Sequence, residues 1–436
     1  MKAVLVPIYI DCIDQNEFNE KLLLVKNLLA GEAEFLEPVT LGNDVPKADA
    51  AVFPVLVGEV YKKVEDIKKI NMPLLVATSE IATMMMWDWE IVTFLKAEGL
   101  NVMAPYNTEH TKTICRAFAV KKEMKQLKFL VYQDNPGDGA QAEIFKRFYW
   151  WEDECTNSIK DKFGITIEKK SYKKLAQGAK LISDVEARKV LSEKSFPVSC
   201  VSDSSLLSAI KMYIAFSKDI AGDKTIKGIG ANCLNESYFS DTTPCLAWNL
   251  LFEEQDMVYA CEADTMSLVT QYMMYKSLKV PVITSNVYPF LFGMVALKHE
   301  QLKEFPKVEN PDDHLLIVHC GYFGLAPQSF CSKWKFKPKV LAIVDDNATA
   351  VDAELPVGDI TLTKIHPTFE RLFTEEGILE KYVGFEDSHC LNGGLVKVDN
   401  GHELIKKSYS HHACVIIGKK NAEIELIANI FNITID

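Results

Sequence analysis

Two carboxylates, Glu262 and Asp264, directly follow the apolar segment MVYAC at 257–261 and precede a helix pattern. The apolar segment is typical of a buried strand. In α/β proteins, ligand sites form where the carboxyl ends of strands meet the N-termini of helices. A structural role fits equally well, because acidic side chains in a first helical turn stabilise the helix dipole. The local pattern therefore leaves both a ligand site and helix capping open.

Three histidines lie at the ends of apolar segments. His319 ends HLLIVHCG, and His411 with His412 begins HHACVIIG. A histidine at a strand end is usually a hydrogen-bonded structural residue, but glutamate and histidine from separate segments also build sites for Mn²⁺-like metals. The sequence contains no HExxH motif and no CxxC pair. Any metal site must therefore be assembled from distant segments.

The composition excludes several classes of protein. The chain has 436 residues with 60 acidic and 48 basic side chains, and its net charge of −12 argues against a nucleic-acid partner. No apolar run reaches the roughly 18 residues of a membrane span. The N-terminal apolar stretch is too short for a signal peptide and indicates a first strand. We therefore expect a cytoplasmic protein without membrane contact, whose 11 cysteines are reduced.

Strand and helix patterns alternate through the first two-thirds of the chain, which predicts parallel sheets. We expect one α/β domain over 1–122 and a second over 123–282, both doubly wound and Rossmann-like. Within the second, the sequence predicts one long helix over 142–163 and a strand at 198–202. The glycine-rich fingerprint of dinucleotide binding is absent from its first loop.

The pattern changes beyond residue 283. Short strands separated by turn residues predict a compact antiparallel sheet or barrel over 283–436. The chain closes with a helix pattern, NAEIELIANIFN. The predicted strands are HLLIVHCG, KVLAIVDD, GDITLTKI, KYVGFED, GGLVKV and ACVIIG.

Four segments, in this order, resemble the L-fucose isomerase family, to which the L-arabinose isomerases are more distantly similar. They are DTTPCLAWNLL…VYACEADTMSLVTQYMM…VPVITSNV, LLIVHCGYFG, LPVGDITLTKI and SHHACVIIGKKNAEIELIANIFNITI. The resemblance spans about 228–436 and is that of a divergent member, whereas the N-terminal half is similar only in its βα architecture. It implies two α/β domains followed by a C-terminal barrel.

The resemblance also implies a site and a reaction. It places a divalent metal, usually Mn²⁺, on Glu262, Asn286, His319 and His412, with His411 beside the last. The reaction would interconvert an aldose and a ketose through an enediol, with Glu262 and Asn286 at the two catalytic positions. Asn286 stands where the family has an acidic ligand. Its amide oxygen can still bind a cation, but it cannot accept a proton. The substrate would be a small sugar or polyol, and the protein a homo-oligomer.

The neutral side chain at position 286 leaves three functions open. The first is a metal-dependent sugar isomerase, the second a sugar-binding or regulatory paralogue that has lost catalysis, and the third a lyase or epimerase on a related polyol. Four aromatic residues are candidates for a sugar pocket, although plain core packing is the commoner role for each: Trp248, Tyr288, Tyr322 and Phe323.

Overall fold

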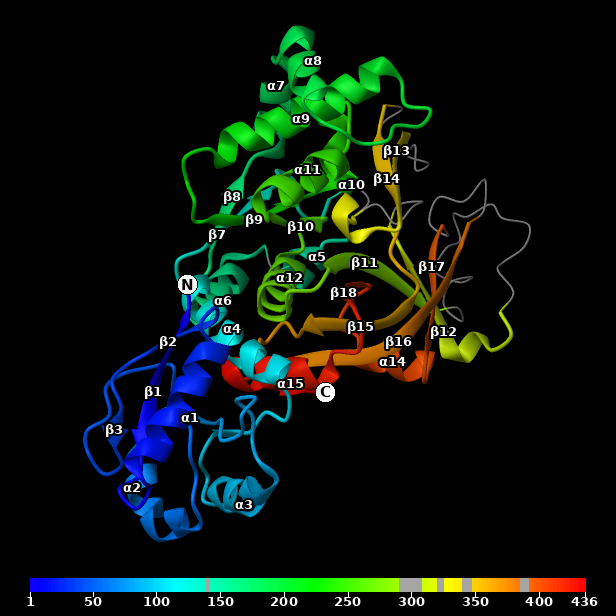
Figure 1. Ribbon diagram of the computed structural model, residues 1–436. Coiled ribbons are helices and arrows are strands. Elements are labelled where there is room, and N and C mark those ends of the chain that lie inside the picture. Colours follow the sequence, from blue (N-terminus) through cyan, green and yellow to red (C-terminus); the bar gives the residue numbers. More distant parts are fainter. Residues whose placement is uncertain (139–141, 150, 290–307, 320–324, 339–346, 385–391) are drawn as a thin grey trace. The chain divides into compact units, whose positions relative to one another are not determined.

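The computed structural model describes residues 1–138, 142–149, 151–289, 308–319, 325–338, 347–384 and 392–436 (Figure 1). These residues form two compact units. Unit 1 comprises 1–123, 276–278 and 422–432, and unit 2 comprises 124–275, 279–421 and 433–436. No helix in the described part of the chain is long and apolar enough to cross a membrane.

Unit 1 is built on a parallel sheet with the strand order β2-β1-β4-β5-β6, in which β3 also pairs with β1. The strands are short and largely buried, as the continuous apolar runs predicted. They are β1 (Ala3–Tyr9), β2 (Ala33–Phe35), β3 (Val39–Thr40), β4 (Ala50–Phe53), β5 (Leu74–Val76) and β6 (Val102–Met103). The helices are α1 (Gln15–Leu28), α2 (Val64–Lys68), α3 (Trp89–Ala97), α4 (Thr108–Met124) and most of α15 (Asn421–Phe431).

Unit 2 begins with a second parallel sheet, whose strand order is β10-β9-β7-β8. Its strands are β7 (Lys128–Tyr132), β8 (Thr166–Lys170), β9 (Ile226–Ala231) and β10 (Val258–Cys261). The helices are α5 (Phe145–Phe148), α6 (Asp153–Phe163), α7 (Tyr172–Lys180), α8 (Asp184–Ser192), α9 (Asp203–Ile220), α10 (Cys233–Glu236), α11 (Cys245–Gln255) and α12 (Thr265–Leu278).

A carboxyl group is buried beside the ends of β7 and β9. Oε1 of Glu236 accepts hydrogen bonds from the N–H groups of Asp134 and Asn135 at 2.7 and 2.9 Å. Burial raises the pKa of Glu236 from 4.5 to about 7, although these two hydrogen bonds oppose the shift.

A closed barrel of six antiparallel strands completes unit 2. Its circular order is β15-β18-β11-β12-β17-β16, and pairing between β15 and β16 closes it. The strands are β11 (Val282–Pro289), β12 (His314–Val318), β15 (Gly358–Ile365), β16 (Arg371–Val383), β17 (Gly393–Val398) and β18 (His412–Ile417). Around it lie a hairpin of β13 (Lys333–Pro338) and β14 (Thr349–Glu354), the short α14 (Gly401–Lys407), and β19 (Thr434–Ile435), which pairs with β16.

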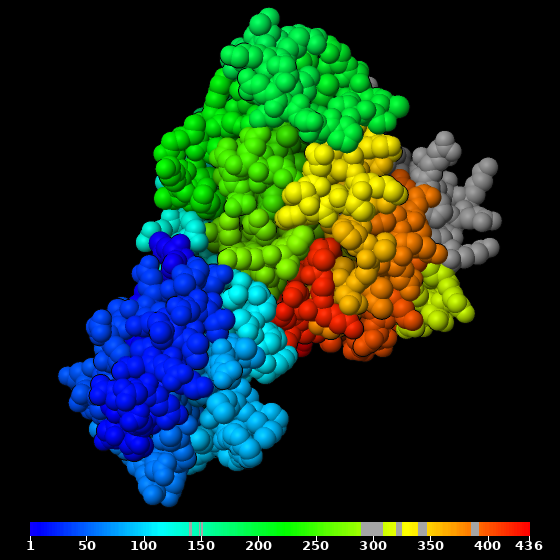
Figure 2. All heavy atoms as spheres, in the orientation of Figure 1, coloured from blue at the N-terminus to red at the C-terminus, as the bar shows by residue number. Residues whose placement is uncertain are grey.

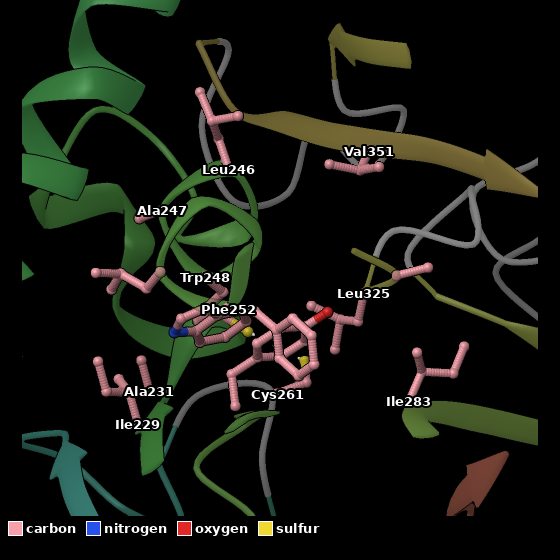
Figure 3. Close-up of a cluster of buried hydrophobic side chains, with 14 of the residues drawn as sticks. Ile229, Ala231, Leu246, Ala247, Trp248, Phe252, Cys261, Ile283, Leu325 and Val351 are labelled. Carbon is pink, nitrogen blue, oxygen red and sulfur yellow. Dashed lines mark hydrogen bonds between the residues drawn. The ribbon is translucent and has the colours of Figure 1, made fainter. Parts of the chain in front are cut away.

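One hydrophobic cluster joins the parallel sheet, its helices and the barrel of unit 2. It includes Trp248 of α11, Cys261 of β10 and Ile283 of β11 (Figure 3). Figure 2 shows the surface of this unit, where the yellow segment around β13 and the orange barrel segments adjoin the green α/β segments. The shared core makes the two parts one packed unit, so side chains at their junction are held by both.

The structure confirms a mixed α/β fold with parallel sheets and a late antiparallel barrel, but some elements differ from expectation. The single helix predicted over 142–163 is interrupted between α5 and α6. The strand predicted at 198–202 is reduced to an isolated bridge between Val198 and Phe336. The predicted strand KVLAIVDD at 339–346 lies outside the described residues.

Candidate metal centre

Glu262 lies in a tight turn between β10 and α12. The turn is closed by a hydrogen bond from the Asp264 N–H to the Cys261 carbonyl at 3.1 Å. The residues between them, Glu262 and Ala263, have φ angles of 51° and 59°. Left-handed backbone costs a non-glycine residue about 1–2 kcal/mol, and such strain is concentrated at functional sites. Asp264 then caps α12, because its Oδ1 accepts from the Ser267 N–H at 2.9 Å.

Asn286 and His412 lie side by side on two barrel strands. β11 and β18 pair with Asn286 directly opposite His412, and the Val287 N–H donates to the His411 carbonyl at 2.7 Å. Directly opposite residues project from the same face of a sheet, with Cβ atoms about 4.5–5.5 Å apart. The register of the barrel therefore places the Asn286 amide next to the His412 ring.

Three side chains with metal-ligating atoms meet at this point. The ligand atoms of Glu262, His411 and His412 all lie within 4.8 Å of one another. Glu262 Oε2, His412 Nε2 and Asn286 Oδ1 are buried and hydrogen-bond to none of the described residues. Buried polar atoms are nearly always paired. One carboxylate, two imidazoles and an amide oxygen form a mixed O/N set that suits a Mn²⁺-like divalent cation. The close grouping of the ligand atoms and their lack of hydrogen-bond partners among the described residues both fit a metal ion.

A hydrogen bond fixes the orientation of His412. Its Nδ1 lies 2.9 Å from Oδ2 of Asp264, a fully buried carboxylate that can only accept. Nδ1 therefore donates to Asp264, and Nε2 is the ring nitrogen left to face the cluster, where it offers a lone pair in the neutral ring. A carboxylate that holds the second nitrogen of a histidine is the usual support of a metal-binding imidazole.

A buried lysine completes this support. Lys364 Nζ lies 2.5 Å from Oδ2 of Asp264 and donates to Oγ of Ser410 at 2.8 Å. The side chains of Lys364 and Asp264 are 3% and 0% exposed. Burial alone would raise the pKa of Asp264, but Lys364 and His412 outweigh burial and hold that pKa well below its usual range. Asp264 is therefore ionised.

His411 contributes a neutral imidazole. Its ring centroid lies 4.2 Å from that of His412. Burial first, and then the charges of His412 and Lys364, lower its pKa well below the ordinary value, against a weaker opposing effect of Asp264. A neutral ring has a lone pair that can bind a cation.

The structure brings together most of the site residues predicted from the sequence. Glu262 and His412 belong to one group of ligand atoms, and Asn286 lies opposite His412 on the neighbouring strand. His319 is buried directly after β12, one position past the Asn286–Val318 pair, and does not belong to the group within 4.8 Å. His411, which the sequence placed only beside the ligands, takes part in that group.

The aromatic candidates have different positions. Trp248 is 1% exposed and stacks on Tyr259 in the core, so packing is its role. Tyr288 is half-buried, and its hydroxyl accepts a hydrogen bond from Nδ2 of Asn286 at 3.4 Å. Tyr322 and Phe323 lie outside the described residues.

Two residues that contact the site, Lys364 and Tyr149, were not predicted from the sequence. Lys364 sits in β15, and only the packing of the barrel on the N-terminus of α12 brings it to Asp264. Tyr149 was expected within a continuous helix, but it lies after α5, and its ring stacks on His412 with centroids 5.2 Å apart. The dense aromatic run FYWW at 148–151 marks the place where the helix stops.

No protein-family model matches this chain, and no characterised protein matches its sequence significantly.

Proposed function

We propose that the protein is a metal-dependent sugar isomerase-like enzyme that interconverts an aldose and a ketose through an enediol. The observation that carries this proposal is the cluster of Glu262, His411 and His412, with unpartnered buried atoms on Glu262, His412 and Asn286. These atoms would hold a divalent metal, of which Mn²⁺ suits the mixed O/N set. When bound, such an ion polarises a sugar carbonyl as a Lewis acid.

The residues divide the remaining work according to their chemistry. Glu262 is the group of this cluster that is suited to take the proton from C2 of the sugar and return it to C1. The amide of Asn286 can bind and orient but cannot exchange a proton. Asp264 keeps the lone pair of His412 directed at the cluster. Proton transfer therefore falls to one carboxylate.

The wider expectations from the family resemblance belong to the same proposal. We propose that both parallel sheets are doubly wound, Rossmann-like layers. We also propose that the protein is a cytoplasmic homo-oligomer acting on a small sugar or polyol. The strand orders β2-β1-β4-β5-β6 and β8-β7-β9-β10 support the first point, because each sheet extends to both sides of its first strand.

Metal binding tests the first step of the proposal. Chelator-treated protein is titrated with MnCl₂ by calorimetry, alongside His412→Gln and the matched control His402→Gln. His402 lies on α14 and its side chain is 48% exposed. We expect wild type and His402→Gln to bind equally, and His412→Gln to bind at least about 10-fold more weakly, as loss of even a supporting group at a metal site does.

Proton exchange tests the reaction. The Mn²⁺-loaded protein is incubated with a panel of aldoses in D₂O, and NMR follows the C2 proton and ketose formation. We expect at least one aldose to lose its C2 proton and form the ketose. No Mn²⁺ binding, together with no C2 exchange in any aldose, contradicts the proposal.

Asn286 favours a second candidate, a sugar-binding or regulatory paralogue without catalysis, because the site lacks a second carboxylate at this position. The variant Asn286→Asp separates the two. If it gains isomerase activity that wild type lacks, the paralogue is supported. If wild type turns over and Asn286→Asp is slower, asparagine has a role in the reaction and the paralogue is excluded.

A further inference from the structure

Tyr149 is held rigidly beside the candidate metal centre. Its carbonyl accepts hydrogen bonds from Thr265, from Oγ1 at 2.9 Å and from the N–H at 3.4 Å. Its ring lies nearly parallel to that of His412, with an interplanar angle of 14° and centroids 5.2 Å apart. Only 1% of the residue is exposed. Backbone and ring are thus both fixed against elements that carry Glu262 and His412.

The hydroxyl of Tyr149 lies beside the carboxylate of Glu262. It is buried and has no well-aligned hydrogen-bond partner among the described residues. Burial raises the pKa of Tyr149 well above its ordinary value, and the negative charges of Glu262 and Asp264 and the closeness of the hydroxyl to the Glu262 carboxylate add to the shift. A phenylalanine would keep the stacking on His412 without burying an unpaired hydroxyl, which is costly. A buried donor held next to the acid–base carboxylate, with no well-aligned partner, is placed to meet a ligand that reaches Glu262.

We propose that Tyr149 is a catalytic residue that donates a hydrogen bond to the sugar oxygen that becomes negatively charged during isomerisation. This inference deepens the proposed function and rests on it. A fixed donor aimed at a developing oxyanion stabilises the transition state without having to reorganise. Tyr149 thereby assists a site in which Asn286 has replaced a carboxylate.

The proton and electron balance needs no further reactant. Glu262 takes the proton from C2, the C2–H electron pair forms the C1–C2 double bond, and the π electrons of the carbonyl move to O1. Tyr149 keeps its proton and stabilises the charge on O1. In the second half, the C1–C2 double bond supplies the electron pair that takes the proton back from Glu262 to C1. The O2–H bond supplies the electrons of the new C2 carbonyl, and the O2 proton passes to O1. The sugar is oxidised at C2 and reduced at C1.

A second buried tyrosine provides a matched control. Tyr259 of β10 is fully buried, stacks on Trp248 with centroids 5.8 Å apart, and has a hydroxyl that hydrogen-bonds to none of the described residues. It does not belong to the Glu262–His411–His412 group. Tyr149→Phe and Tyr259→Phe therefore make the same chemical change, but only the first makes it at the site.

The test compares turnover and ligand binding in both variants. With the aldose that wild type converts, Tyr149→Phe should lower kcat by about 10²–10³-fold, as loss of one oxyanion donor does. KM and the Mn²⁺ affinity should change less than about 3-fold, and Tyr259→Phe should match wild type. C2 proton exchange should fall in parallel with ketose formation. A Tyr149→Phe enzyme within about 3-fold of the wild-type kcat overturns the proposal.

A binding arm separates failure of this inference from failure of the proposed function. Xylitol, ribitol and arabinitol are titrated into the Mn²⁺-loaded proteins. If wild type converts no aldose but binds a pentitol, the isomerase proposal fails. The donor role is then supported if Tyr149→Phe binds the pentitol about 2–10-fold more weakly than wild type, which is the effect of one hydrogen bond. Equal binding to both proteins refutes the donor role. Absence of both turnover and pentitol binding refutes both proposals.

Discussion

Replacing Asp264 with asparagine removes the negative charge from a pair that is closed to solvent. The Asp264 and Lys364 side chains are 0% and 3% exposed, and Oδ2 lies 2.5 Å from Nζ. In the variant the lysine charge stays buried. Of the two groups that contact Nζ in wild type, only Oγ of Ser410, at 2.8 Å, still accepts a hydrogen bond from the lysine without a change of charge. Breaking a buried pair in this way costs about 3–5 kcal/mol. Asparagine still caps α12, so loss of the cap adds little.

Urea unfolding of the chelator-treated proteins measures this cost. The variants are Asp264→Asn, Lys364→Met, the double variant, and Ser267→Ala as a control. Ser267→Ala removes only the hydrogen bond from Oγ to Asp264 Oδ2 at 2.9 Å, which is worth about 1 kcal/mol. We expect each single charge variant to lose about 3–5 kcal/mol, and the double variant to lose clearly less than their sum, because no unpaired lysine charge remains.

Two results would refute this reasoning. The first is a loss for Asp264→Asn no larger than that for Ser267→Ala, which would mean that water or another group relieves the lysine charge. The second is strict additivity in the double variant, which would mean that the two side chains do not stabilise each other. An unchanged denaturant slope across the series is needed for either comparison.

Three further predictions concern the scaffold. Burial raises the pKa of Glu236 from 4.5 to about 7. The protonated form therefore stabilises the fold at low pH, and this stability is lost as the pH rises through the folded-state pKa. From pH 5 to pH 8 the free energy of unfolding of wild type should fall by roughly 1–3 kcal/mol relative to that of Glu236→Gln. Parallel urea midpoints of the two proteins across that range would contradict it. Gly393→Ala should cost more than about 2 kcal/mol, because a Cβ there would clash with the Ile317 carbonyl oxygen. Gly31→Ala should be nearly neutral, because a Cβ there meets nothing within 4 Å. Equal thermal stability of the two variants would refute this. Ala263→Val should cost more than about 2 kcal/mol and weaken Mn²⁺ binding, because the left-handed backbone at this position disfavours a β-branched residue. Ala263→Gly should stay within about 1 kcal/mol of wild type. An unchanged calorimetric Mn²⁺ affinity in the valine variant would show that the turn does not position Glu262.

The sequence was informative where chemistry is local. Glu262 and Asp264 follow an apolar strand and begin a helix, and this alone predicts a strand-to-helix turn with a capping carboxylate. The continuous apolar runs likewise predict buried parallel strands, and turn residues between short strands predict the barrel. Each of these features is decided by neighbours in the chain, which periodicity reveals.

The features that the sequence missed depend on distant partners. Lys364 is an ordinary strand residue until the barrel packs on the N-terminus of α12 and buries it against Asp264. The helix pattern around Tyr149 is intact, yet the helix stops there. The Tyr149 carbonyl accepts hydrogen bonds from Thr265 and the Tyr149 ring packs on His412. These tertiary contacts override helix propensity. The grouping of His411 with Glu262 and His412 depends on the barrel register, which single-sequence patterns do not contain.

The order of the ligands along the chain has a consequence for biosynthesis. Glu262 and Asn286 are synthesised well before His411 and His412, and β18 is the last strand of the barrel to be made. A nascent chain therefore has no complete cluster, and domains that fold during synthesis must reach their cores without the ion. An ion would find this full set of side chains only once β18 has joined the barrel, so occupancy of this site would mark a closed barrel.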